Sequence, residues 1–154
     1  VVLAAVMIGS LISAKEIKEM PADYGRDNIY HQLVDFLEVK DLEYGYATFW
    51  YSQVMTMLSN SKVKVRAVEA EDERGVVADL YQSSYRWFLE DGYDRCFILL
   101  TESEYKRIMY SVSWNTWTQD CLVEEYYYLG YHIFVFSKNV MASTMEQWGL
   151  QGLR

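Results

Sequence analysis

The chain has 154 residues, which suits one domain of ordinary size. It contains 22 acidic and 14 basic residues, and its formal net charge of −8 argues against a nucleic-acid-binding protein, because phosphate binding requires a surplus of lysine and arginine. Aromatic residues make up 16% of the chain, and tyrosine is the commonest of them. Because a tyrosine ring has an apolar body and a polar tip, this composition is typical of interfaces and sugar-stacking surfaces.

The first 14 residues, VVLAAVMIGSLISA, carry no charge, and a charged segment follows from Lys15. A helix needs about 20 apolar residues to cross a bilayer, so residues 1–14 are predicted to be the end of a transmembrane helix that begins upstream. A clipped signal peptide and a buried core helix are the alternatives. The first two interpretations place the rest of the chain on the extracytoplasmic side of the plasma membrane.

Three further segments complete the predicted organisation. Residues 15–27 are expected to form a linker that ends in a polar loop. Residues 28–138 contain the periodic segments and are expected to form one extracytoplasmic domain. Residues 139–154 carry scattered apolar residues and two glycines, which is typical of a C-terminal tail.

The first half of the domain alternates helical and extended patterns. Apolar residues at helical spacing predict an amphipathic helix over about 28–40, with its N-cap at Asp27 or Asn28. A short extended element is expected at 44–47, directly before a second helical pattern. Residues 62–68 alternate polar and apolar with period two, which predicts a strand with one buried face.

The middle of the chain gives a weaker pattern. Residues 69–86 begin with several acids, which indicates an exposed acidic loop, with a short helical turn expected at 76–81. Residues 85–89 are interpreted as a strand. Residues 95–101 are almost continuously apolar, which predicts a central strand covered on both faces.

The last third is predicted to hold a helix and a closing hairpin. A helix over about 102–109 is expected after an N-cap at Thr101 or Ser103. Residues 114–117 are interpreted as a polar-aromatic loop, and residues 123–137, with a glycine turn inside, as a closing strand or hairpin. This succession predicts an α/β fold: a single compact α/β sandwich with a mixed sheet flanked by helices.

No motif assigns a catalytic residue, a metal ligand or a cofactor. The sequence contains no nucleophile elbow, P-loop, GxGxxG or HExxH. Cys96 and Cys121 are too far apart for the usual zinc spacings, and His31 and His132 are isolated from ligand-spaced acids. If the domain is exported, a disulfide between the cysteines is an alternative. Cys96, however, lies in an apolar run, where a buried free thiol is the usual expectation.

The specific signal is a composite of three segments. They are Tyr44-Gly45-Tyr46-Ala47-Thr48-Phe49-Trp50, a helical stretch that ends at Leu58-Ser59-Asn60, and the strand 63–68. This composite resembles the extracytoplasmic domain that follows the last transmembrane helices in bacterial polytopic GT-C glycosyltransferases, the superfamily of the dolichyl-phosphate-mannose type enzymes. The run from Gly130 to Phe136 is similar to the closing strand of that domain, and the resemblance extends over residues 28–138.

The resemblance implies a non-catalytic role for this domain. In that superfamily the catalytic acid lies in a loop near the first membrane helices, which this chain does not contain. The implied partner is the membrane-embedded remainder of the same polypeptide, whose active site the domain would cover, or for which it would orient an acceptor glycan or a lipid-linked sugar. The rings expected to contact the sugar are Tyr44, Tyr46, Phe49, Trp50 and Tyr51, although rings at strand-to-helix junctions are ordinarily core residues.

Two other functions stay open from the sequence. The chain is also compatible with a membrane-tethered glycan- or peptide-binding module that has no associated transferase. A small enzyme would have to find its acid and base among Asp41, Glu43, Asp91 and Glu102, none of which is accompanied by a nucleophile or cofactor motif.

Overall fold

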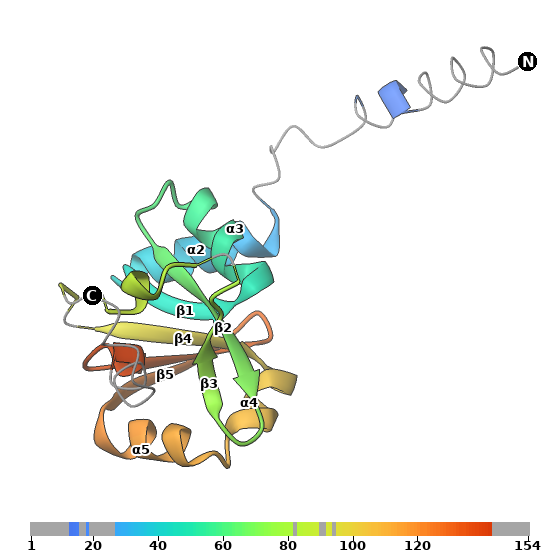
Figure 1. Ribbon diagram of the computed structural model, residues 1–154. Helices are drawn as coiled ribbons and strands as arrows, with labels where there is room; N and C mark the ends of the chain where they lie inside the picture. Colours follow the sequence, from blue (N-terminus) through green and yellow to red (C-terminus); the bar gives the residue numbers. More distant parts are fainter. Residues whose placement is uncertain are drawn as a thin grey trace, which may run out of the picture.

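The computed structural model describes residues 13–15, 18, 27–81, 83–89, 92, 93 and 95–142. In this part of the chain a mixed sheet of six strands has helices on both faces (Figure 1), which confirms the predicted fold class. In chain order the elements are α2 (Ile29–Val39), β1 (Tyr44–Thr48), α3 (Phe49–Leu58), β2 (Lys64–Glu71), β3 (Gly75–Ala78), the 3-10 helix η1 (Tyr85–Leu89), β4 (Cys96–Thr101), α4 (Glu102–Ile108), α5 (Val112–Asp120), β5 (Leu122–Tyr128) and β6 (Tyr131–Phe136).

The predictions for the two ends of the chain fall largely outside the described residues. Of the expected transmembrane segment 1–14, the structure describes only Ser13 and Ala14. No helix among the described residues is both long and apolar enough to cross a bilayer. At the other end, Val140 and Met141 belong to the buried core, and residues 143–154 are not described.

The sheet is built around three parallel strands. Its order is β3-β2-β1-β4-β6-β5, in which β1 pairs in parallel with both β2 and β4. Strands β3 and β6 run antiparallel to their neighbours, and β5 completes the sheet beside β6. Helix α3 is the crossover that the parallel pair β1 and β2 requires.

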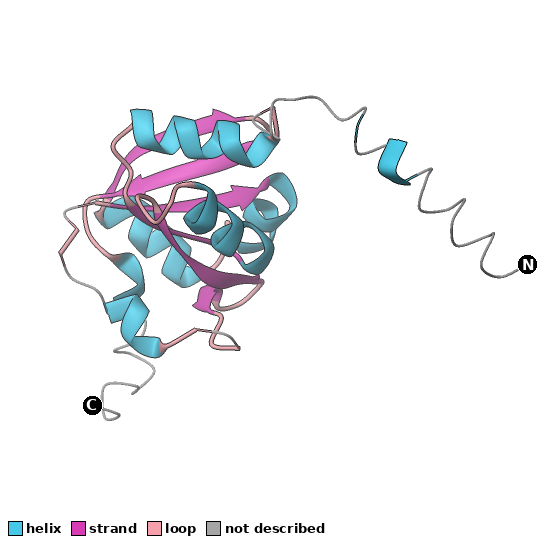
Figure 2. Cartoon of the chain, turned by 90° about the horizontal axis from the view of Figure 1, so that it is seen from above, coloured by secondary structure: helices cyan, strands magenta, loops and turns pink. Residues whose placement is uncertain are grey.

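Strand β4 separates two layers of hydrophobic core. Its side chains alternate, so that Cys96, Ile98 and Leu100 pack on the side of α4 and α5, whereas Phe97 and Leu99 pack on the side of α2 and α3. All five are 0% exposed, as predicted for a strand covered on both faces. Figure 2 shows helices on both faces of the sheet.

Side-chain caps begin α2 and α4 at positions that the sequence indicated. The Asn28 side chain accepts a hydrogen bond from the Tyr30 N–H at 2.9 Å. At the start of α4, Thr101 and Glu104 form a capping box, in which the Glu104 carboxylate accepts the Thr101 N–H at 2.7 Å. Each cap satisfies amide groups that the first helical turn leaves without an intrahelical partner.

The interpretation of residues 69–86 as an acidic loop with a helical turn at 76–81 is wrong for residues 69–71 and 75–78, which belong to strands. Strand β2 continues to Glu71 and pairs with β3 in an antiparallel hairpin. Val76 and Val77 are buried there, and Gly75 adopts a φ of 78°, which the turn requires. The hairpin tip is held by tertiary contact, because the Ser113 hydroxyl on α5 donates to the Arg74 carbonyl oxygen at 2.9 Å.

Two aromatic segments also differ from their predictions. Residues 85–89 form the 3-10 helix η1 rather than a strand, and the buried Phe88 ring stacks on Tyr46 with centroids 6.0 Å apart. Residues 114–117 lie inside α5 rather than in a loop, because the Ser111 side chain caps that helix. Trp114 and Trp117 face the core from α5, with 3% and 6% exposure.

Strands β5 and β6 form the predicted closing hairpin. Leu129 and Gly130 have φ angles of 52° and 85°, and two consecutive positive φ angles are typical of the tight type I′ turn. β6, the later strand in the chain, lies between β4 and β5 in the sheet.

Gly45 occupies a tight position in the middle of the sheet. It pairs with Val65 on β2 and with Phe97 on β4. A Cβ atom at Gly45 would lie 2.5 Å from the Phe97 ring, so the absence of a side chain allows that ring to fill the core.

We expect Gly45→Ala to lower the free energy of unfolding by about 2–3 kcal/mol, because overpacking displaces the ring or the backbone. Gly92→Ala is the control, since a Cβ there meets nothing within 4 Å. Urea denaturation of both variants checks the prediction, and equal stability would contradict the close packing.

Candidate ligand-binding site

The topology creates a crevice at the carboxyl ends of the parallel strands. Helix α3 begins directly after β1, and α4 begins directly after the neighbouring strand β4. These two helices cover opposite faces of the sheet. In open α/β sheets, ligands bind at such a point, where the connections from adjacent parallel strands diverge.

A hollow of about 390 Å³ lies at this end of the sheet, and we call it the strand-end hollow. Phe49 and Trp50, the first two residues of α3, form part of its wall. Trp50 is 77% exposed, and its ring meets Phe49 edge to face with centroids 5.4 Å apart. The remaining lining residues are Thr48, Val68, Glu69, Ala70, Glu71, Asp79, Glu104 and Arg107.

The charged groups of the strand-end hollow are largely fixed by contacts within the protein. Arg107 donates to the Ala70 carbonyl oxygen at 3.3 Å and lies 3.6 Å from a carboxylate oxygen of Asp72. Glu104 belongs to the capping box of α4, and Asp79 accepts the Tyr81 N–H at 2.9 Å. These contacts present carboxylate oxygens and one guanidinium beside the Trp50 ring.

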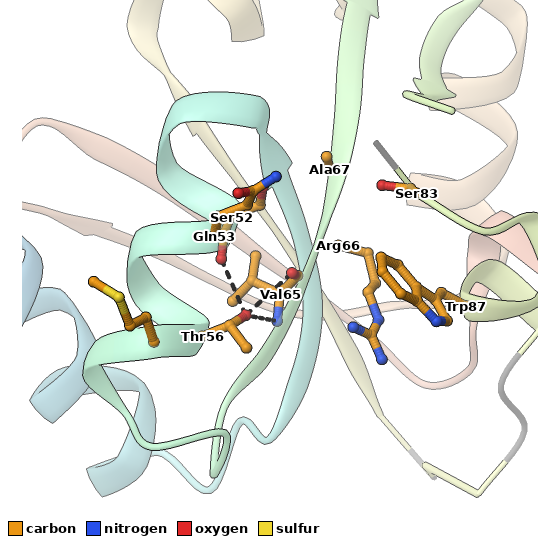
Figure 3. A pocket seen from close by; sticks show the side chains of 9 residues that line it. Ser52, Gln53, Thr56, Val65, Arg66, Ala67, Ser83 and Trp87 are labelled. Atoms are coloured by element: carbon orange, nitrogen blue, oxygen red, sulfur yellow. Dashed lines mark hydrogen bonds between the residues drawn. The ribbon is translucent and has the colours of Figure 1, made fainter. Parts of the chain in front are cut away.

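A second hollow, of about 400 Å³, follows along β2, and we call it the edge hollow (Figure 3). Strand β3 pairs with β2 only from Val68 onward, so the earlier residues of β2 form an open edge. Thr56 closes that edge from α3: its hydroxyl accepts the Val65 N–H at 2.9 Å and lies 3.2 Å from the Val65 carbonyl oxygen. The Ser59 hydroxyl contacts the Val63 N–H and carbonyl oxygen in the same way, each at 3.1 Å.

Across this hollow from α3, the Arg66 guanidinium packs on the Trp87 indole (Figure 3). Its Cζ atom lies 4.7 Å from the ring centroid, within the range of a cation–π interaction. Trp87 comes from η1 and is 39% exposed. The other lining residues are Ser52, Gln53, Thr56, Met57, Val65, Ala67 and Ser83.

Tyr44 and Tyr46, two of the predicted sugar-binding rings, lie in the core. They are 1% and 0% exposed and pack edge to face with centroids 5.5 Å apart. The Tyr44 hydroxyl donates to the Trp87 carbonyl oxygen, and the Tyr46 hydroxyl donates to Asn139 Oδ1 at 2.6 Å. Burial raises the pKa of Tyr46, so this hydroxyl stays a neutral donor, and neither ring presents a face to a surface ligand.

Tyr51 is separated from the two hollows. Its ring packs against Tyr131 on β6 and Tyr30 on α2, with centroids 5.4 and 6.1 Å away. Burial, followed by the contact with Tyr51, raises the pKa of Tyr131 to about 12. Of the five predicted rings, the structure therefore brings together at the strand-end hollow only Phe49 and Trp50.

The acids considered for an enzyme do not converge. Asp41 and Glu43 line hollows before the start of β1, whereas Glu102 follows the end of the neighbouring parallel strand β4, at the opposite end of the strands. Glu102 contacts His132 at 2.7 Å, and this hydrogen bond lowers the pKa of the carboxyl. Asp91 lies outside the described residues. No group of three or more His, Cys, Asp or Glu among the residues that the structure describes could hold a metal ion.

Both cysteines are free and buried. Strand β6 separates them, because Cys96 pairs with Phe136 on one side and Leu122, the neighbour of Cys121, pairs with Phe136 on the other. Two strand spacings amount to about 10 Å, which exceeds the roughly 7 Å between Cα atoms that a disulfide allows. Burial raises the pKa of the Cys96 thiol to about 12.

Comparison with known proteins finds no matching family model, no matching curated protein and no matching solved structure. The candidate site therefore rests on the geometry of this chain. Sequence reasoning missed Arg66, Trp87 and Thr56. The period-two pattern of β2 assigned Arg66 to its polar face, but no local pattern indicated that Trp87 would meet it.

We expect neither thiol of the native protein to react with dithionitrobenzoate at pH 8, because Cys96 is 0% and Cys121 5% exposed. Both thiols should react after unfolding without reductant. If the unfolded, unreduced protein has no reactive thiol, the finding that both cysteines are free is contradicted.

The raised pKa of Cys96 gives a second prediction. An unfolded thiol has a pKa near 8.5, so the free energy of unfolding should fall as the pH rises from about 8.5 toward 12.

Thr56→Val is expected to lower the free energy of unfolding by about 1–3 kcal/mol, because it removes the hydroxyl that satisfies the buried Val65 amide at nearly constant volume. Thr116→Val is the matched control, since the Thr116 hydroxyl bonds only the Val112 carbonyl oxygen of an exposed helical turn. Chemical denaturation compares the two variants. Equal losses would show that the edge contact contributes nothing specific.

Proposed function

We propose that residues 28–138 form a non-catalytic extracytoplasmic domain of a membrane-bound glycosyltransferase-like protein, in which the strand-end hollow helps to orient an acceptor glycan or a lipid-linked sugar. The single observation that carries the binding role is the exposed Trp50 ring at a hollow lined by hydrogen-bonding groups. The membrane association is supported by the uncharged segment 1–14 and by the resemblance of residues 44–68 to the GT-C extracytoplasmic domain.

Trp50 has the properties of a sugar-stacking platform. Its indole is 77% exposed, although a ring of this size gains free energy when it is covered, and Phe49 holds it by an edge-to-face contact. A pyranose ring has an apolar C–H face that packs on an indole. Covering Trp50 with such a face removes apolar surface from water without burying a charge.

The surrounding charges favour a neutral, hydroxyl-rich ligand at this hollow. Carboxylate oxygens of Glu69, Glu71, Asp79 and Glu104 can accept hydrogen bonds from sugar hydroxyls, and Arg107 can donate to them. An anionic group would meet the carboxylates of Glu69, Asp79 and Glu104 and the Arg107 guanidinium, while Glu71 is paired with Arg74, so the strand-end hollow disfavours it.

A membrane-tethered glycan- or peptide-binding module without a transferase is the second candidate, because it would use the same ring and the same hollow. The coding sequence upstream of Val1 separates the two candidates. Several hydrophobic spans would support the transferase-like protein, whereas a start codon directly before Val1 with a basic segment would favour the module.

We expect Trp50→Ala to weaken binding of neutral methyl glycosides to the full chain about tenfold or more, because the stacking surface is removed. Tyr110→Ala is the matched control, since Tyr110 is 82% exposed and lines neither hollow. Methyl glycosides of glucose, galactose and mannose are titrated while tryptophan indole NMR signals are followed. Thermal unfolding of both variants establishes that the fold is kept.

The proposal fails if none of the three glycosides moves the Trp50 indole signal. It also fails if Trp50→Ala binds them as well as the Tyr110→Ala control does.

A further inference from the structure

Strand β5 lies at one edge of the sheet, and among the described residues it pairs only with β6. Every second residue of an edge strand directs its N–H and C=O groups away from the sheet. Tyr128 and Tyr131 flank the two-residue turn of the hairpin and bond each other, so Glu125 and Tyr127 are the residues whose backbone groups point outward. Within the part of the chain that the structure describes, no other backbone group bonds them. We call this row of groups the β5 edge.

The side chains of Glu125 and Tyr127 lie on the same face of the sheet, and both approach His132 on β6. The Tyr127 ring meets the His132 ring with centroids 4.9 Å apart, and a Glu125 carboxylate oxygen lies 3.9 Å from His132 Nδ1. Both nevertheless face solvent, since Tyr127 is 67% exposed and the Glu125 side chain 52%. The β5 edge therefore presents a carboxylate and a tyrosine hydroxyl next to each other.

This arrangement makes the β5 edge complementary to a copy of itself. When two copies pair antiparallel about a two-fold axis at Tyr126, Glu125 of each copy lies opposite Tyr127 of the other. The outward backbone groups of both residues then find partners, because each such pair exchanges two hydrogen bonds. On the same face, each carboxylate can accept a hydrogen bond from the tyrosine hydroxyl opposite it.

The neighbouring symmetric registers are less favourable. An axis at Glu125 would set two carboxylates directly opposite each other, which is destabilising. An axis at Tyr127 would set Glu125 opposite Leu129, which belongs to the turn and continues no strand. With the axis at Tyr126, Val123 and Leu129 come opposite each other at the two ends of the paired segment, and their exposed apolar surface is covered.

We propose that two copies of this chain associate through their β5 edges, with the two-fold axis at Tyr126, and join their sheets into one continuous sheet. This inference goes beyond the proposed function and needs no sugar. Strand β5 runs in the direction of β4 and β1, and the strands of the second copy run the opposite way. The two strand-end hollows of the dimer therefore lie at opposite ends of the joined sheet, where they receive two separate ligands.

The first test is sedimentation velocity of the full chain over a series of concentrations. We expect the mass to rise from that of one chain, 18.2 kDa, to that of two. Each chain carries a net charge of −8, so added salt should strengthen the association by screening the repulsion between copies. A single-chain mass at every concentration overturns the inference, and so does association that salt weakens, which would indicate a surface complementary in charge.

Tyr127→Glu should weaken the association about tenfold or more, because it sets an acid opposite Glu125 at both ends of the pairing. Tyr110→Glu is the matched control: Tyr110 is 82% exposed and lies outside β5, and the substitution changes the net charge equally. Thermal unfolding checks that both variants are folded. If the two variants associate equally well, the copies meet through another surface and the inference is overturned.

Cysteine cross-linking tests the register. In the proposed dimer, the two Tyr126 residues form a pair without backbone hydrogen bonds, with Cα atoms about 4.5 Å apart, so Tyr126→Cys should oxidise to a covalent dimer. The two Glu125 residues are diagonal neighbours about 7–8 Å apart, so Glu125→Cys should cross-link poorly. The native thiols are buried and do not interfere in the folded protein.

Efficient cross-linking of Glu125→Cys but not of folded Tyr126→Cys would show a different register and overturn the inference. Absence of a covalent dimer from both variants would overturn it too. Neither result bears on the proposed function, because the β5 edge and the strand-end hollow share no residue.

Discussion

Two hydroxyl groups, one on α3 and one on its C-cap residue, determine how the binding surface is built. Thr56 on α3 contacts the backbone amide and carbonyl of Val65 on β2, and Ser59, the C-cap of α3, contacts those of Val63, just before β2 begins. The helix thus takes the place of a neighbouring strand where β3 does not reach. Since α3 also begins directly after β1, both ends of the helix are fixed, and Trp50 is held at one hollow while Gln53 is held at the other.

Sequence periodicity correctly predicted the elements whose buried residues follow from the apolar pattern of the segment itself. Helix α2, strand β4 and the closing hairpin each carry a pattern that matches one or two buried faces. Strand β3 was missed because it has only four residues, beside a run of acids, and is ordered by pairing with β2 and by the contact of its tip with α5. Residues 85–89 have strand-like composition, but Phe88 packs on Tyr46 from a 3-10 turn.

The candidate site was predictable to the same limited extent. The sequence placed the aromatic segment 44–51 at a strand-to-helix junction, and in the structure this junction, from β1 to α3, lies beside the strand-end hollow. Which of its rings reach the surface depends on the sheet: Tyr44 and Tyr46 point from β1 into the core, whereas Trp50 on the first turn of α3 stays exposed. Arg66 and Trp87 meet only because the chain after β3 returns beside β2, and no short-range pattern contains that information.

The position of β6 between the two cysteines has a consequence for how the chain reaches its native state. Before this last strand is in place, nothing in the sheet keeps the β4 thiol and the thiol preceding β5 apart. An oxidant that acts on such an intermediate would link them into a bridge that the native register excludes, and the cross-linked chain could not admit β6. To reach the native state, β6 must therefore pair between β4 and β5 before the two thiols are oxidised. The refolding yield under oxidising conditions should depend on how fast β6 is inserted.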